Sequence, residues 1–283
     1  MGNWYELRIV VPKDLEEQAT TALFELGTNG IRSEAEGELS ALLAYFQTPP
    51  TAVALDDALA AYGVPRTTHS IEPLPQEDTD WTENWKLHFS PHAVGEHFFV
   101  CPPWAPNAPT GRTAIIIHPA MAFGTGQHAT TRGCLLLIEA ACAAARVESA
   151  ADVGTGSGIL AIALAKLGAA RVYAVDNDPV ACASARENAA LNEVAATLRI
   201  GDSMADISEP CDLIVANLFA DLLIGFAAEL SNRCAPHGTI ICSGMLQEDL
   251  PRVLARFAET GWVQHATQVE EPWCTVQLLR SRV

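Results

Sequence analysis

The sequence predicts an α/β protein, in which a small α+β domain precedes a larger domain built on a mostly parallel sheet. Apolar runs and amphipathic helices alternate regularly from about Ile115 onward, as in sheets covered by helices on both faces. The last two apolar runs are joined by a short turn, so these two strands must pair antiparallel. The first 73 residues follow another order: strand, helix, strand, strand, helix, strand.

The small domain is expected over residues 1–73. Its segments are the strand WYELRIVV, the helix DLEEQATTALFELG closed by Gly27, short strands near Ile31 and at ALLAYF, the helix VALDDALAAYG and a strand near THSIE. This order is that of two split βαβ halves, the ferredoxin-like arrangement. The segment carries no glycine-rich turn at a strand edge, so we expect it to hold a substrate rather than to perform chemistry.

Residues 74–110 are expected to form a linker with one short helix. Prolines stand at positions 73, 75, 91, 102, 103, 106 and 109, around the helical stretch DTDWTENWKLHF. Trp81 and Trp85 lie four residues apart and hence on one face of that helix. We expect them to pack the linker between the two domains, an interpretation favoured over direct contact with the substrate.

The larger domain is expected over residues 111–283. Its strand candidates are TAIIIHP, SAADVG, ARVYAVD, TLRIGD, CDLIVANL, GTIICSG, WVQHATQVE and WCTVQLLR. Helices are expected between them, at 130–145, 159–167, 179–192, 219–234 and 248–260. Near-continuous apolar strands indicate a parallel sheet that is buried on both faces.

Charge narrows the choice of partner. The net charge is −17, and residues 1–110 carry 16 acidic against 5 basic side chains. The chain has only three lysines, whereas nucleic-acid binding relies on Lys and Arg to neutralise phosphates. We therefore expect a basic partner and no direct nucleic-acid binding, while an acidic surface that serves solubility alone remains an alternative.

Location and metal content are also predicted. No run of 18 uncharged apolar residues occurs, and Glu6 and Arg8 interrupt the apolar stretch at the N-terminus. We therefore expect neither a membrane span nor a signal peptide, and a cytoplasmic protein. The eight cysteines form no C-x-x-C pair and have no histidine at zinc spacing, so no metal site is expected.

The strongest chemical signal is the glycine-rich stretch DVGTGSG, which follows an apolar strand and opens a helix. Glycines allow a tight turn at the sheet edge and the close approach of a ligand, and the helix N-terminus would face a ligand carboxylate. Dinucleotide-binding folds use a similar turn. Here Ile159 stands where their last glycine or alanine would be, and Asp152 would repel a pyrophosphate but suit a cationic amino group. S-adenosylmethionine is therefore favoured over a nicotinamide cofactor.

Two further strand ends complete the expected cofactor site. Asp176 ends ARVYAVD, 18 residues beyond Gly158, where an acid can accept both ribose hydroxyls. The stretch Gly201-Asp202-Ser203 follows the next strand, where an adenine ring would rest. That stretch could equally be a simple turn.

Asn217 ends the following strand, CDLIVAN, at the same edge of the sheet. Methylation of an amine needs a neutral nitrogen, and an Asn carbonyl can orient that nitrogen by accepting its N–H groups. Amine methyltransferases with an N-P-P-[YF] motif use this position, but here Leu218 and Phe219 follow the asparagine. A polar cap of the strand is the alternative role.

A second glycine-rich loop, MAFGTGQHATT, runs into a helix before the first strand of the sheet. We expect Thr130 or Thr131 to cap that helix and the loop to fold over a cofactor. His128 could act as a general base. Because no partner carboxylate is identifiable from spacing, a structural or substrate-ordering role is favoured.

Taken together, AFGTGQHATT, DVGTGSGILAIALAKLGA, VDNDP, VANLFADLL, DWTENWKLHFSP and VCPPW resemble the ribosomal protein methyltransferase A (PrmA) family of bacteria over nearly the whole chain. The resemblance implies a seven-stranded, Rossmann-like class I methyltransferase domain behind a ferredoxin-like recognition domain. It also implies S-adenosyl-L-methionine as cofactor, and trimethylation of lysines and of an N-terminal amine on protein eleven of the large ribosomal subunit. A monomer is expected.

The resemblance also assigns residues. The family's cofactor contacts correspond to Thr131, Gly154, Asp176 and Asn217, and Asn217 is the expected catalytic residue. We expect Phe123, Thr155, Gly156 and Ser203 to complete the cofactor site. Two alternatives remain. One is a methyltransferase that acts on a different protein lysine or on a small molecule. The other is a binding module without activity, which the intact cofactor residues disfavour.

Overall fold

The computed structural model describes residues 5–28, 30–46, 48–65, 69–73, 90–118, 126–195 and 197–281. The chain divides into two units, Met1–Glu83 and Asn84–Val283. Each unit has a sheet and an apolar core of its own. The two are therefore described separately.

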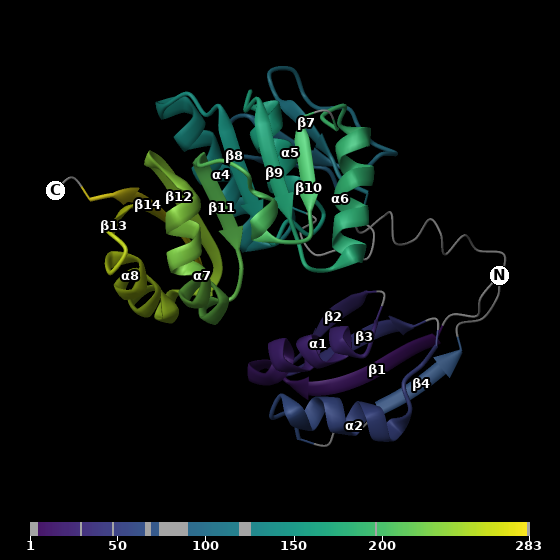
Figure 1. Ribbon diagram of the computed structural model, residues 1–283. Coiled ribbons are helices and arrows are strands. Elements are labelled where there is room, and N and C mark those ends of the chain that lie inside the picture. The colour runs from purple at the N-terminus through teal and green to yellow at the C-terminus, as the bar shows by residue number, and fades with distance from the viewer. Residues whose placement is uncertain are drawn as a thin grey trace. The chain divides into compact units, whose positions relative to one another are not determined.

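The first unit is a four-stranded antiparallel sheet with two helices (Figure 1). Its strands lie in the order β2-β3-β1-β4, and each neighbouring pair is antiparallel. This is the βαββαβ order predicted from the sequence. The elements are β1 (Tyr5–Pro12), the 3-10 turn η1 (Lys13–Leu15), α1 (Glu16–Glu25), β2 (Ile31–Glu36), β3 (Leu39–Phe46), α2 (Ala52–Ala61) and β4 (His69–Pro73).

One apolar cluster holds this unit together. Alternate residues of β1, Leu7, Ile9 and Val11, are fully buried, as expected of a strand with one face toward a core. They pack with Leu23 of α1 and Leu55 of α2 in the same cluster. Both helices therefore cover the same face of the sheet.

The second unit is built on a seven-stranded sheet in the order β10-β9-β8-β11-β12-β14-β13. Strands from β10 to β12 pair parallel, and β14 pairs antiparallel with both β12 and β13. The predicted parallel sheet with a terminal antiparallel hairpin is confirmed. The strands are β8 (Ser149–Val153), β9 (Arg171–Val175), β10 (Leu198–Gly201), β11 (Cys211–Asn217), β12 (Cys234–Leu246), β13 (Trp262–Glu270) and β14 (Trp273–Arg280).

Helices cover both faces of this sheet (Figure 1). One apolar cluster joins the sheet to α4, α5 and α6, and the other joins it to α7 and α8. Neighbouring residues of β8 divide between them: Ala150 packs in the first cluster and Ala151 in the second. The helices are α4 (Ala129–Ala144), α5 (Ile159–Lys166), α6 (Pro179–Leu191), α7 (Ala220–Arg233) and α8 (Leu250–Ala258), with 3-10 turns η2 (Met204–Asp206) and η3 (Gln247–Asp249).

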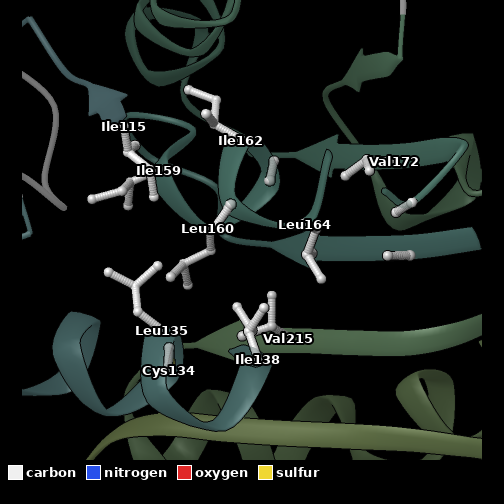
Figure 2. Packing of buried hydrophobic residues seen from close by; sticks show 14 of the residues in the cluster. Ile115, Cys134, Leu135, Ile138, Ile159, Leu160, Ile162, Leu164, Val172 and Val215 are labelled. Carbon is white, nitrogen blue, oxygen red and sulfur yellow. The ribbon is translucent and has the colours of Figure 1, made fainter. Parts of the chain in front are cut away.

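The helix α5 is buried on all sides for most of its length. Its residues from Ile159 to Leu164 are all buried, which explains why the sequence ILAIAL has no polar face. Figure 2 shows Leu160 and Leu164 facing α4 and the strands of the sheet, and Ile159 beside Ile115. This packing fixes the start of α5, and with it the glycine-rich turn that precedes the helix.

A small three-stranded sheet adjoins this core. It contains β5 (His92–Val94), β6 (Phe98–Cys101) and β7 (Thr113–Ile116), with β6 parallel to β7. Phe98 and Val100 are buried in the same apolar cluster as α4 and α5. Part of the segment expected as a linker is thus built into the second unit, and TAIIIHP supplies a strand of this smaller sheet. Trp81 and Trp85 lie outside the described residues.

Candidate active site

The glycine-rich turn after β8 is shaped by positive φ angles and close neighbours. Gly154, Gly156 and Gly158 have φ angles of 76°, 54° and 84°, which favour glycine. A Cβ atom on Gly154 would lie 2.5 Å from a methyl group of Leu218, and one on Gly158 would lie 3.1 Å from the Cα atom of Ala185. The positive φ angles therefore disfavour a side chain at all three positions, and space is also tight at Gly154 and Gly158.

The turn is anchored to the neighbouring strand β9. The backbone N–H groups of Gly154 and Thr155 both donate to the carbonyl of Val175, at 2.9 and 3.1 Å. The N–H of Gly156 donates to Oδ2 of Asp176 at 2.9 Å. The structure thus brings together three of the predicted cofactor residues, Gly154, Gly156 and Asp176, at the carboxyl edge of the sheet, where open α/β sheets bind ligands.

Asp176 keeps acceptor capacity after these contacts. Its Oδ1 accepts the backbone N–H of Asp178 at 3.0 Å, and Asp178 in turn caps α6 by accepting from Val180. Each carboxylate oxygen has a second lone pair, and the side chain is only partly buried. The carboxylate is therefore held in place by the protein and still able to accept two hydroxyl groups.

Asp152 lies inside the turn, with none of its surface exposed. Its Oδ2 accepts the hydroxyl of Thr155 at 2.6 Å and the N–H of Ala161 at 3.0 Å, and its Oδ1 has no partner among the described residues. Burial raises the pKa of this carboxyl to about 7, although both hydrogen bonds favour the ionised form. Asp152 thus supports the turn from inside, rather than facing a ligand as the sequence suggested, and the Thr155 side chain points into this interior contact.

Asn217, at the end of β11, contacts the start of α4. Its Nδ2 donates to the hydroxyl of Thr130 at 3.3 Å, and no described residue donates to its Oδ1. The side chain is partly exposed. The described contacts therefore fix the amide on its nitrogen side.

The helix α4 begins one residue earlier than predicted, and a different residue caps it. The cap is His128, whose Nδ1 accepts from the backbone N–H of Thr130 at 3.3 Å, and the prediction of Thr130 or Thr131 as the cap was wrong. Thr130 uses its hydroxyl for His128 and Asn217 instead. Sequence reasoning missed Thr130 as a contact of Asn217, because two adjacent threonines give no sign of which one faces the strand.

Thr131 and Ser203 have different surroundings. Thr131 is 1% exposed, and its hydroxyl is a buried group without a partner among the described residues. Ser203 is exposed and caps η2, where its Oγ accepts from Ala205 and Asp206 completes a capping box. Phe123 lies outside the described residues. None of these positions assigns or excludes a cofactor contact.

Within the part of the chain that the structure describes, no group of three or more His, Cys, Asp or Glu side chains could hold a metal. In the same part, no helix is long and apolar enough to cross a bilayer. The described polar groups at the carboxyl edge of the sheet include backbone N–H groups of the turn, the carboxylate of Asp176, the amide of Asn217 and the hydroxyl of Thr130.

Comparison with known proteins identifies the family. A family model described as ribosomal protein L11 methyltransferase (PrmA) matches residues 3–281. The ribosomal protein L11 methyltransferase of Geobacter metallireducens is 36% identical over 95% of this chain and 96% of its own length. That of Synechococcus sp. is 34% identical over 99% of this chain and 98% of its own.

A solved structure agrees with these relatives. The crystal structure of a ribosomal protein L11 methylase from Lactobacillus delbrueckii subsp. bulgaricus matches with a TM-score of 0.64 and 32% identity, covering 69% of this chain and 100% of that chain. The resemblance noted in the sequence motifs is therefore confirmed along almost the full length. This chain belongs to the ribosomal protein L11 methyltransferase family.

Proposed function

We propose that this chain transfers methyl groups from S-adenosyl-L-methionine to lysine ε-amines of ribosomal protein L11, with the N-terminal α-amine of that protein as a second acceptor. The observation that carries the proposal is the fixed amide of Asn217 at the carboxyl edge of the sheet. Its nitrogen is held by Thr130, and its oxygen is left for an amine N–H. The named activity of the relatives supports the same substrate.

The residues around the glycine-rich turn fit the cofactor. Asp176 can accept two ribose hydroxyls, and the backbone at Gly154 and Gly156 has the positive φ angles of a tight turn at the sheet edge, where such a ligand binds. Among the described residues the buried hydroxyl of Thr131 has no hydrogen-bond partner, and a polar cofactor group would satisfy it. When bound, S-adenosylmethionine supplies an electrophilic methyl group on its sulfonium.

The protein's part in the transfer is to position the amine. With cofactor bound, the Asn217 carbonyl would accept an N–H of the neutral amine and so would orient the nitrogen lone pair toward the methyl group that the cofactor supplies. A free lysine titrates near pH ~10.4, and entry beside the apolar side chains of Leu218 and Phe219 lowers that pKa. Bulk water takes the proton, and no general base is assigned.

The ferredoxin-like domain of residues 1–73, which lies within the first unit, is proposed to hold the protein substrate. The excess of acidic residues in 1–110 suits a basic partner and disfavours direct binding of nucleic acid. We further propose that the enzyme acts as a monomer in the cytoplasm, where its ribosomal substrate is made.

The proposal is tested with purified L11 and labelled S-adenosylmethionine, beside a lysate of cells that lack this enzyme. We expect label in L11 lysines, loss of most turnover in Asn217→Ala, and normal turnover in Asn232→Ala, an exposed asparagine near the other end of α7. Label confined to RNA or small molecules would overturn the proposal. Unchanged turnover in Asn217→Ala would remove this residue from the reaction.

A further inference from the structure

Three polar side chains connect the cap of α4 to the end of β11. The Nδ1 atom of His128 lies 2.7 Å from the hydroxyl of Thr130, and that hydroxyl lies 3.3 Å from Nδ2 of Asn217. The backbone N–H of Thr130 also donates to the same Nδ1. His128 is therefore two hydrogen bonds away from the amide that the proposed function assigns to the substrate amine.

Thr130 is fixed at its main chain as well. Its carbonyl accepts the hydroxyl of Ser243 at 3.2 Å, and Ser243 is paired with Asn217 in the ladder between β11 and β12. The hydroxyl of Thr275 on β14 lies 2.6 Å from that of Ser243. Because the main chain of Thr130 cannot readily shift, the direction of its hydroxyl proton is the remaining variable.

The proton positions follow from counting donors. An Nδ1 atom that accepts the Thr130 N–H carries no proton, so His128 is neutral with its proton on Nε2. The Thr130 hydroxyl then donates to Nδ1, and its oxygen can only accept from Asn217. This forces the NH₂ group of Asn217 toward Thr130 and leaves the carbonyl for the substrate.

We propose that His128 is a positioning residue, whose neutral, Nδ1-accepting form fixes the amide orientation of Asn217 through Thr130. The inference rests on the proposed function of Asn217. In this inference His128 acts on the amine only through Thr130 and Asn217, and takes no part in proton or methyl transfer.

The surroundings of His128 favour its neutral form. Burial is the main cause that lowers its pKa below the ordinary 6.5, and the cation of Arg132 acts in the same direction, while Glu270 opposes it. Arg132 and Glu270 pair with each other, with Nε 3.1 Å from Oε2. The indole of Trp273 meets the imidazole edge to face, with 4.9 Å between ring centroids. The turn between β13 and β14 thus helps to hold the ring.

Protonation of His128 would reverse the chain of donors. Nδ1–H could no longer accept from the backbone of Thr130, and it would donate to the Thr130 hydroxyl instead. The hydroxyl proton would then face Asn217 and favour its carbonyl oxygen, which turns the NH₂ group toward the substrate amine. An amide in that orientation offers a donor where an acceptor is needed.

Two variants of His128 separate positioning from folding. His128→Ala removes the cap and the acceptor, whereas His128→Asn supplies a carbonyl oxygen, which caps helices well and does not titrate. His237→Asn is the matched control, since this histidine is exposed at the start of β12, at the other end of the sheet from Asn217. All three are assayed on L11 with saturating cofactor, after a check of melting temperature and cofactor affinity.

We expect His128→Ala to keep its cofactor affinity and to lose about tenfold in kcat, equivalent to about 1.4 kcal/mol, and His128→Asn to recover most of that loss. Deprotonation of the substrate amine gives log kcat/KM a slope of one against pH. Below the pKa of His128, this slope should increase toward two in the wild type and in His237→Asn, because His128 must also lose a proton. In His128→Asn the slope should stay at one. Equal slopes in wild type and His128→Asn would overturn the inference.

An NMR measurement keeps this test separate from that of the proposed function. The side-chain NH₂ signals of Asn217 should shift with the protonation of His128 in the wild type and stay constant in His128→Asn, whether or not substrate is present. If the Asn217 NH₂ signals do not shift when His128 is protonated, the inference is refuted, even if Asn217 is essential for activity. Full activity of Asn217→Ala would refute the role of Asn217, whatever the NMR signals do.

Discussion

The backbone N–H of Gly156 donates to Oδ2 of Asp176 across 2.9 Å, which joins the glycine-rich turn after β8 to the end of β9. One carboxylate thus serves two purposes in the proposed site. It fixes the conformation of the turn through Gly156, and its remaining lone pairs can accept hydroxyl groups of a ribose. Cofactor binding and the shape of the turn should therefore depend on the same side chain.

Replacement of Asp176 by alanine should weaken S-adenosylmethionine binding at least about tenfold, since hydrogen bonds to a charged group contribute about 1.5–3 kcal/mol each. Asp176→Asn should bind with intermediate affinity, because an amide oxygen can still accept from Gly156 but carries no charge. Calorimetry on the folded variants measures both. Unchanged affinity in Asp176→Ala would remove this residue from the site.

Gly158→Ala should lower the free energy of unfolding by at least about 1–2 kcal/mol, the usual cost of a left-handed residue with a Cβ atom. Its φ is 84°, and the added Cβ would lie 3.1 Å from the backbone of Ala185. Gly225→Ala on the exposed side of α7 meets nothing within 4 Å and should instead stabilise by up to about 1 kcal/mol. Urea titrations measure the free energy of unfolding of both variants. An equal change in the two would show that Gly158 is not required by the conformation of the turn.

The buried carboxyl of Asp152 predicts a pH dependence of stability. Its pKa is raised from an ordinary 3.8 to about 7 by burial, so between these values the folded state binds more protons than the unfolded state. The free energy of unfolding should therefore fall as pH rises through this window, by at most about 1.4 kcal/mol per unit, and level off above pH 7. Asp152→Asn should lack this contribution. Parallel stability curves for the two proteins, without bound cofactor, would show that the carboxyl is not buried in this way.

Replacement of Phe219 should weaken binding of the protein substrate without changing the affinity for the cofactor. This residue follows Asn217 by two residues, begins the turn into α7, and is 65% exposed. An exposed aromatic ring beside the proposed amine position suits the aliphatic part of a lysine. Phe219→Ala should raise KM for L11 several-fold and leave cofactor affinity unchanged. Val263→Ala is the control, because Val263 is exposed at the opposite edge of the sheet; a similar KM in both variants would exclude the contact.

Patterns along the chain predicted the larger sheet and the position of the glycine-rich turn after β8. The antiparallel end followed from the short connection between β13 and β14, and the turn followed from three glycines in five residues after an apolar strand. Both are local features, in which residue type directly limits backbone geometry. The strands β5 and β6 were missed because prolines at 91, 102 and 103 flank them, while their burial depends on contacts with distant helices.

Side-chain directions in the site could not be read from the sequence. Successive helix residues point about 100° apart, so the Thr130 hydroxyl contacts Asn217, whereas the Thr131 hydroxyl is buried and has no partner in the described part of the chain. The role of His128 as a cap depends on a β-region backbone at that residue, and a threonine beside it is statistically the better cap. Asp152 was placed near a ligand by its spacing, but the start of α5 covers it.

The last prediction concerns the first unit. A fragment of residues 84–283 keeps β5 and β6, whereas a cut at the expected boundary of 110 would remove the buried Phe98 and Val100 from the core. The longer fragment should fold and bind S-adenosylmethionine with the affinity of the full chain, because all described residues of the proposed cofactor site lie within it. It should methylate L11 at a small fraction of the full-length rate.

The reason is that a linked recognition domain raises the effective concentration of its substrate at the site, which a separate polypeptide cannot do. Residues 1–83 added in trans at equal concentration should therefore fail to restore the rate. The acidic charge of this region should also make the full-length rate decrease with salt, while the slow rate of the fragment responds less. Melting temperature, cofactor affinity and L11 methylation are measured in parallel. If the fragment folds, binds cofactor and methylates L11 at the full-length rate, then residues 1–83 do not serve to hold the substrate.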